Sequence, residues 1–276
     1  MSDFAGYCEA THESNTTKQK GTKPHMTISA DAYLAALKGV LDDAASTQRD
    51  ALADAADRIS DSLAAGGVLQ AFGTGHSEAL CMELAGRAGG LVPTNRIALR
   101  DLVLRGGADP ELLGSDKLER DPAIARNLFA LTGADPADVF VIASQSGING
   151  SIVEFALAVK EAGHDLIAFT STEHSLRTPS RHPSGRRLLD IADVVIDNRA
   201  PYGDSLLPLP GGDGSVCAAS SISAAMLAQM LVAEVVRRRL AVGDTPPVYL
   251  SANVPGGDEH NNTLESRYAG RIRRGA

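Results

Sequence analysis

The sequence is poor in aromatic residues and contains no tryptophan. Aromatic residues make up 4% of the 276 positions, although 43% of the chain is hydrophobic. A core built from this composition must consist of Ala, Leu, Val and Ile side chains. No apolar run approaches the roughly 20 residues that a helix needs to cross a bilayer. We therefore expect one larger α/β domain with a helical appendage and no membrane contact.

Cysteine is also scarce, because the chain has only Cys8, Cys81 and Cys217. These three cysteines show no metal-binding spacing, and an odd number cannot pair completely. With no secretory leader, the sequence predicts reduced thiols and a cytoplasmic location. The acidic residues and histidines lack close ligand spacing as well, so we expect no metal and no cofactor. The net charge of −8 argues against nucleic acid as a partner.

The chain divides into four predicted parts. Residues 1–25 are polar and lack periodicity, which predicts a disordered leader or a tag. Residues 26–65 have apolar residues at helical spacings, and Gly66-Gly67 ends this helical part. Residues 66–245 form the main domain, and residues 246–276 form a polar tail that we expect at the active site.

A glycine-rich turn follows the first predicted strand of the main domain. Residues 68–72 are expected to form a buried strand, and residues 79–85 are expected to form a helix. The first N–H groups of a helix have no internal partner and therefore favour an anion. A plain tight connection is the alternative, so a second element has to support the phosphate interpretation. The turn consists of Gly73, Thr74, Gly75, His76 and Ser77.

A second polar turn follows the clearest strand of the sequence, residues 138–143. It reads Ser144-Gln145-Ser146-Gly147 and leads into a helix predicted over 152–162. Its hydroxyls, amide and glycine can hold phosphate oxygens without a lysine, whereas the alternative is an N-cap serine in a tight turn. Neither a GxxxxGK[ST] loop nor a GxGxxG turn is present, so neither NTP hydrolysis nor dinucleotide binding is favoured.

Buried strands that alternate with helices predict a parallel sheet covered on both faces, a three-layer α/β/α sandwich. Further strands are expected over 91–98, 165–170 and 192–197. Pro93 makes the second strand a lateral one, which gives five strands in the order 2-1-3-4-5. The switch point of this order lies between strands one and three, and their carboxyl ends carry the two polar turns.

These motifs resemble those of the sugar isomerase (SIS) domain. The resemblance rests on Gly73–Ser77, on Glu83-Leu84-Ala85-Gly86-Arg87 and on Ser144–Gly147, and it covers roughly residues 60–235. The tail Leu250–Asn261 is similar to a subgroup of bacterial SIS proteins, with isomerase-like and N-acetylmuramic acid 6-phosphate etherase-like relatives. The resemblance implies an SIS-type fold and a phosphorylated sugar as the ligand.

The resemblance also implies roles for residues of the two turns. Ser77 matches the hydroxyl of the first phosphate loop, and Asn149 falls where many members have threonine. Thr74, Gly75 and His76 complete the first loop as expected substrate contacts. The second loop is matched by Ser144, Gln145 and Ser146.

An arginine-rich loop over 177–187 is expected to be solvated, with cover for an anionic ligand as the alternative.

Three residues are candidates for the chemistry. Removal of the proton next to a sugar carbonyl requires a carboxylate. By resemblance, Glu83 matches a helix glutamate that heptose isomerases use as an acid and base; an ion pair with Arg87 at i+4 is the alternative. Glu259 and His260 lie between glycine and asparagine pairs, which suits a hinged loop at the edge of an active site, even that of a neighbouring subunit. A surface turn is the alternative for this pair.

The sequence therefore predicts an enzyme that acts on a phosphorylated sugar. The favoured substrate is an amino-sugar 6-phosphate such as N-acetylglucosamine 6-phosphate, and the first step is deprotonation at C2. Isomerases of the family carry a histidine on a late helix, but residues 215–240 contain none, which tilts the prediction toward elimination by a lyase over isomerisation. We expect a homo-oligomer, a dimer or a tetramer. The alternative is a non-catalytic sensor of sugar phosphates.

Overall fold

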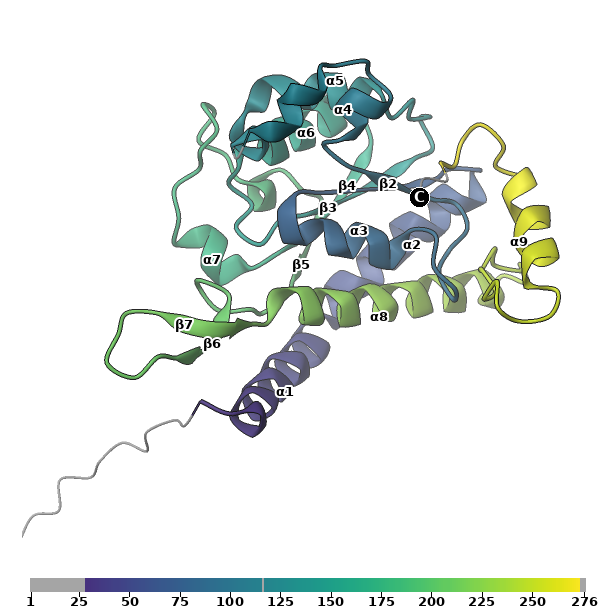
Figure 1. Cartoon of the computed structure of the whole chain (residues 1–276). Coiled ribbons are helices and arrows are strands. Elements are labelled where there is room, and N and C mark those ends of the chain that lie inside the picture. The colour runs from purple at the N-terminus through teal and green to yellow at the C-terminus, as the bar shows by residue number, and fades with distance from the viewer. Residues whose placement is uncertain (1–27, 116, 274–276) are drawn as a thin grey trace, which may run out of the picture.

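The computed structural model describes residues 28–115 and 117–273. The expected leader at residues 1–25, with Cys8, lies outside the described residues. The chain folds into a five-stranded sheet between helices, and a two-stranded hairpin projects from it (Figure 1). The strands of the sheet are β1 (Leu69–Gly73), β2 (Thr94–Ile97), β3 (Val139–Ala143), β4 (Asp165–Thr170) and β5 (Val194–Asp197).

The five strands are parallel and lie in the order β2-β1-β3-β4-β5, which confirms the predicted topology. β2 is an edge strand, as Pro93, the residue before it, predicted. Gly73, the last residue of β1, pairs with Ala143, the last residue of β3. The turns that follow these two strands therefore leave the sheet side by side.

Helices cover both faces of the sheet. α2, α3 and α8 lie on one face, and α4, α5 and α6 lie on the other (Figure 1). The helices are α1 (Ala30–Thr47), α2 (Arg49–Ala64), α3 (Glu78–Leu84), α4 (Asp101–Leu104), α5 (Ala125–Ala130), α6 (Gly150–Glu161), α7 (Thr172–Leu176), α8 (Ser220–Ala241) and α9 (Gly257–Ser266).

The central strand β3 divides its side chains between two hydrophobic clusters. Val139 and Val141 pack with residues of α2, α3 and α8, whereas Phe140 and Ile142 pack with residues of α5 and α6. Because both faces of β3 are covered, all five of its residues are buried. This is why the strand appears in the sequence as a continuous apolar run.

The prediction of one apolar helix over 215–240 is wrong at its start. Residues 215–218 form β7 (Ser215–Ala218), which pairs antiparallel with β6 (Ser205–Pro208). α8 begins at Ser220, whose N–H and hydroxyl both donate hydrogen bonds to the Asp204 carboxylate, at 2.8 and 2.7 Å. The sequence did not reveal this boundary, because the two strands are only four residues long and lack strict alternation of apolar and polar residues.

α8 bears on the expectation that no segment of the chain is apolar enough to cross a bilayer. By length and composition, it is the one helix among the described residues that is long and apolar enough to cross a bilayer. The sequence criterion counted uninterrupted apolar runs, and polar residues interrupt this helix. Its apolar face, including Leu227, Leu231 and Val235, is buried in the core cluster against α2 and α3. α8 is thus a core helix of the α/β domain.

The two described cysteines lie in contrasting surroundings. Cys81 is on α3 and is fully buried in the core cluster. Burial raises the pKa of its thiol well above the ordinary value, because a thiolate there would be desolvated. Cys217 is exposed on β7, with a left-handed backbone (φ +68°).

Candidate functional site

The first polar turn closes tightly at the end of β1. A Cβ added to Gly73 would lie 2.7 Å from the carbonyl oxygen of Ser77, so only glycine fits there. Gly75 has a φ of +55°, which also favours glycine. The turn continues as a short 3₁₀ helix over Gly75–Ser77 and then as α3. It leaves His76 exposed and Ser77 half-buried at the carboxyl end of the strand.

The second polar turn is held by its own serine. The Ser144 hydroxyl accepts a hydrogen bond from the N–H of Gly147 at 3.1 Å, and Gly147 has a φ of +64°. Asn149 is the residue before α6, but its side chain does not cap this helix. The first N–H groups of α6 therefore lack a side-chain cap, and such groups favour an anionic ligand.

The two turns open into one cleft of about 700 Å³ at the carboxyl ends of β1 and β3. This is the switch point of the sheet, where ligands bind in open α/β folds. A cavity of this size is large enough for a small ligand. The cleft contains every residue that the sequence assigned to phosphate binding: Thr74, Gly75, His76, Ser77, Ser144, Gln145, Ser146 and Asn149.

Gln145 brings an unused donor to the cleft. Its side-chain oxygen accepts a hydrogen bond from the Asn198 amide at 2.7 Å. That contact fixes the orientation of the Gln145 amide, and its nitrogen is buried with no partner among the described residues. A buried donor without an acceptor is unfavourable by about 1–3 kcal/mol, so this nitrogen suits a ligand oxygen.

Glu119 was not predicted from the sequence, yet it lies between the two turns. One of its carboxylate oxygens accepts a hydrogen bond from the Thr74 hydroxyl at 3.0 Å. The other accepts one from the Asn149 amide at 2.9 Å. Its backbone carbonyl accepts a third from the Ser151 hydroxyl at 2.6 Å. Glu119 thus joins both turns and places a carboxylate in the cleft.

Arg181 is a cation of the cleft that belongs to the arginine-rich loop. Its guanidinium donates a hydrogen bond to the Asn149 side-chain oxygen at 2.7 Å. Both ends of the Asn149 amide are therefore engaged, one by Glu119 and one by Arg181. Arg181 lines the cleft, which is the position that cover for an anionic ligand, the alternative interpretation of this loop, requires.

The opposite wall of the cleft includes His174 and Tyr202. Their rings lie 4.9 Å apart, and the guanidinium of Arg177 stacks 4.1 Å from the Tyr202 ring centre. Burial lowers the pKa of His174 below its ordinary value of 6.5. The imidazole is thus neutral at pH 7 and adds no positive charge to the cleft.

Glu83 does not line this cleft. Its carboxylate accepts hydrogen bonds from Arg87, four residues later on the chain, and from the Gln229 amide of α8 at 2.7 Å. The ion pair named as the alternative is thus present. Within one chain, Glu83 has a structural partner on each side and is turned toward α8.

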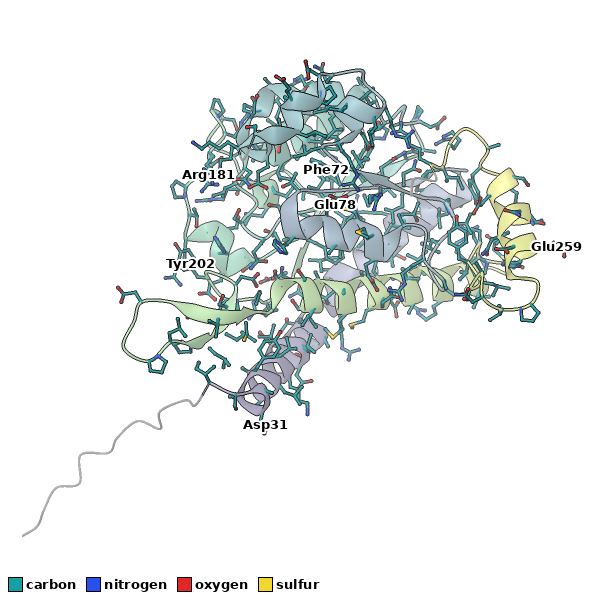
Figure 2. The ribbon with its side chains drawn as sticks, viewed as in Figure 1. Asp31, Phe72, Glu78, Arg181, Tyr202 and Glu259 are labelled. Carbon is teal, nitrogen blue, oxygen red and sulfur yellow. The ribbon has the colours of Figure 1, made fainter. Side chains whose placement is uncertain are left out.

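Glu259 and His260 also lie away from the cleft. They belong to the first turn of α9 and not to the expected hinged loop. Gly256, with a φ of +78°, ends the preceding loop and starts the helix. His260 contacts the Val248 carbonyl oxygen at 3.0 Å. Figure 2 shows Glu259 at the opposite end of the molecule from Arg181 and Tyr202.

Within residues 28–115 and 117–273, no group of three or more His, Cys, Asp or Glu side chains is arranged to hold a metal ion. The cleft instead offers hydroxyls, amides, backbone N–H groups, one arginine and two carboxylates, Glu119 and Asp204. These groups can donate and accept hydrogen bonds to a polar ligand.

Comparison with known proteins identifies relatives along most of the chain. Residues 32–171 match the SIS domain family. A UPF0309 protein of Listeria monocytogenes is 40% identical over 226 residues, which cover 82% of this chain and 91% of the relative. A UPF0309 protein of Geobacillus kaustophilus is 39% identical, with 82% and 89% covered.

Solved structures show the same fold at low sequence identity. The phosphoheptose isomerase of Neisseria gonorrhoeae superposes with a TM-score of 0.51 at 17% identity, covering 74% of this chain and 95% of that one. A phosphoheptose isomerase of Francisella tularensis superposes with the same score at 15% identity and with the same coverage. The chain, whose two polar turns meet in one cleft, belongs to the SIS domain family, together with the UPF0309 proteins.

Proposed function

We propose that the cleft binds a phosphorylated sugar, with the phosphate group on the turn Ser144–Gly147 and the start of α6. The observation that carries this proposal is the single cleft into which both polar turns open. The unpartnered nitrogen of Gln145 supplies a donor, and Arg181 supplies positive charge at the same site. Hydrogen bonds to a charged oxygen contribute about 1.5–3 kcal/mol each.

The favoured substrate remains an amino-sugar 6-phosphate such as N-acetylglucosamine 6-phosphate. Proton removal at C2, next to the C1 carbonyl of the open-chain sugar, gives an enolate. Reprotonation at C1 then gives isomerisation, whereas loss of a C3 substituent gives elimination. The protein would accordingly be a phosphosugar lyase or isomerase, and the lack of any histidine in residues 215–240 supports the lyase.

Glu119 is the carboxylate that we propose as the proton acceptor. It lines the cleft beside both phosphate-binding turns. Asp204, the other carboxylate there, is more fully occupied at the start of α8, where it accepts three hydrogen bonds, two from Ser220 and one from the Ala219 N–H. Glu119 accepts from two donors only, which leaves about two of the roughly four acceptor positions of a carboxylate open.

Glu83, Glu259 and His260 remain candidates only through a second copy of the chain. The dimer or tetramer expected from the sequence could bring the partner's α3 or α9 to the cleft. In this arrangement they would support Glu119 from across a subunit interface. Variants of these residues, described in the Discussion, separate this arrangement from one in which a single chain holds the whole site.

The binding proposal is tested with Ser146→Ala. We expect the dissociation constant for N-acetylglucosamine 6-phosphate to rise at least tenfold, as for the loss of a hydrogen bond to a charged group. Calorimetry with unphosphorylated N-acetylglucosamine gives the contribution of the phosphate. The matched control is Ser266→Ala on α9, which should bind like the wild type. Equal affinity for the two sugars would contradict the proposal.

A non-catalytic sensor is the second candidate. It is favoured by the observation that Glu83, Glu259 and His260 lie outside the cleft of their own chain. The two functions differ in whether the bound sugar loses its C2 proton. Exchange of that proton in deuterated water, followed by absorbance of an unsaturated product, would establish the enzyme. Tight binding without exchange would establish the sensor.

A further inference from the structure

A second cavity, of about 600 Å³, lies on the far side of α3 along the edge strand β2. It shares no lining residue with the cleft. Its floor is β2, and its walls are the end of α3 and helix α4. We call it the arginine groove, because five arginines line it beside a single carboxylate, Asp101: Arg87, Arg96, Arg100, Arg105 and Arg273. This positive charge contrasts with the net charge of −8 of the whole chain.

Arg96 lies in the floor of the groove, and its guanidinium makes no hydrogen bond among the described residues. Its side chain is only 23% exposed, and its nearest carboxylate oxygen, on Glu78, is 3.9 Å away. That carboxylate is occupied by Arg100, which donates to it at 2.5 and 3.3 Å. Removing a guanidinium from water without a hydrogen-bonded anion is unfavourable. Arg96 therefore lacks an acceptor that an anionic ligand would supply.

Thr94 gives an independent indication at the same place. It stands two residues before Arg96, so both side chains lie on the same face of β2. Thr94 is 4% exposed and lines the groove, and its hydroxyl oxygen is buried with no hydrogen-bond partner among the described residues. Such orphaned groups are uncommon in folded proteins and call for a partner.

The remaining lining residues define the kind of ligand. Arg105 has only a 3.5 Å ion pair with Asp101 and keeps donors free for a second anionic group. Met82 and Leu104 are 55% and 71% exposed and offer apolar surface. Guanidinium groups bind phosphate oxygens in a bidentate manner, and a cavity of this volume holds a small molecule.

We propose that the arginine groove is a second ligand site, for an organic diphosphate. The phosphates bind Arg96, Arg105 and the Thr94 hydroxyl, and the organic part lies along Met82 and Leu104. Arg100 connects the site to Glu78, the first residue of α3 after the glycine-rich turn. The proposal stands whether or not the cleft binds a sugar phosphate.

The test is calorimetry with pyrophosphate and with adenosine diphosphate as the probes. All variants are made in a Ser146→Ala background, so that anion binding in the cleft is weakened. We expect Arg96→Gln to weaken binding of both probes at least tenfold. Arg237→Gln, on the exposed side of α8, removes the same charge and should have no effect. Adenosine diphosphate should lose more affinity than pyrophosphate in Met82→Ser.

Thr94→Val separates binding from folding. Valine has the shape of threonine, and the hydroxyl that it lacks has no partner, so the free energy of unfolding should not fall. Pyrophosphate affinity should nevertheless drop several-fold. Absence of binding in the background protein would overturn the proposal, as would equal binding by Arg96→Gln and Arg237→Gln. Size-exclusion chromatography identifies the other occupant of the groove. If the background protein binds neither probe, elutes as a dimer and becomes a monomer in the Arg96→Glu variant, the groove is an interface between copies of the chain.

Discussion

At the scale of single residues, Glu119 connects the parts of the candidate site. Thr74 comes from the first turn, Asn149 lies between the second turn and α6, and each donates a hydrogen bond to a different carboxylate oxygen. Asn149 in turn accepts from Arg181. The Glu119 carboxylate can therefore act on a substrate and can also hold the two turns in position. These two roles predict different effects of the substitution Glu119→Gln.

Glu119→Gln removes the base and keeps the size of the side chain. We expect the rate of C2 proton exchange to fall at least ~100-fold, which is the usual contribution of a general base. Affinity for the sugar phosphate should stay near that of the wild type, since the phosphate is bound by the second turn. Exchange is measured by proton NMR, and affinity by calorimetry.

The matched variants for this experiment are Glu83→Gln and Glu259→Gln. If the cleft of one chain holds the whole site, both should exchange at nearly the wild-type rate. A large loss in either of them, with Glu119→Gln active, would contradict the assignment of Glu119. It would instead support a site that is completed by a neighbouring copy.

At the scale of elements, the start of α6 is fixed by a close backbone approach. A Cβ added to Gly150 would lie 2.2 Å from the carbonyl oxygen of Arg120, a contact that requires the backbone to shift. Arg120 follows Glu119, so this approach also sets where the carboxylate enters the cleft. The position of Glu119 thus depends on Gly150, which is 31 residues later in the sequence.

Gly150→Ala should therefore destabilise the protein, although alanine is the better helix former. We expect the free energy of unfolding to fall by about 1–3 kcal/mol, the usual effect of overpacking, and the affinity for the sugar phosphate to fall with it. The control is Gly39→Ala on α1, where nothing lies within 4 Å of an added Cβ. That variant should gain about 0.5–1 kcal/mol. Urea unfolding measures both, and a stabilised Gly150→Ala would contradict the argument.

The sequence revealed the elements whose signals are local. β1 and β3 are short apolar runs that end in polar, glycine-containing turns, and with Pro93 as the sign of a lateral second strand these features predicted the sheet order and the eight residues of the two turns that line the cleft. Glu119 was missed because it lies in the stretch 101–137, where 3₁₀ turns give no periodicity. The start of α9 was missed because a left-handed Gly256 suits a hinge as well as a helix start.

At the scale of the whole molecule, the C-terminal segment is tied to the base of the sheet. The Asp138 side chain is fully buried and accepts hydrogen bonds from the Val68 N–H at 2.8 Å, the Gln70 amide at 2.9 Å and the Arg271 guanidinium at 2.5 Å. Arg273 donates its backbone N–H to the Asn95 side-chain oxygen at 2.6 Å. The tail thereby covers the ends of β1 and β2 away from the cleft.

Arg271→Ala should leave the buried Asp138 charge without its cation. Breaking a buried pair typically destabilises by about 3–5 kcal/mol, and because Arg271 is partly exposed we expect roughly 2 kcal/mol here. Arg267→Ala, an exposed arginine of the same segment, is the control and should change stability by less than about 0.5 kcal/mol. Thermal and urea unfolding give the comparison. Equal stability of the two variants would show that the tail is not anchored through Asp138.

The difference in exposure between Cys81 and Cys217 allows local opening of this protein to be measured by thiol labelling. A thiol reagent reaches Cys217 on the exposed hairpin directly, whereas it reaches Cys81 only when α3 separates from the core. The labelling rate of Cys81 therefore reports how often α3, the helix that follows the first turn, separates from the core. Because a bound ligand that holds this turn closed would slow that rate, the chain carries a native reporter of occupancy that needs no engineered cysteine.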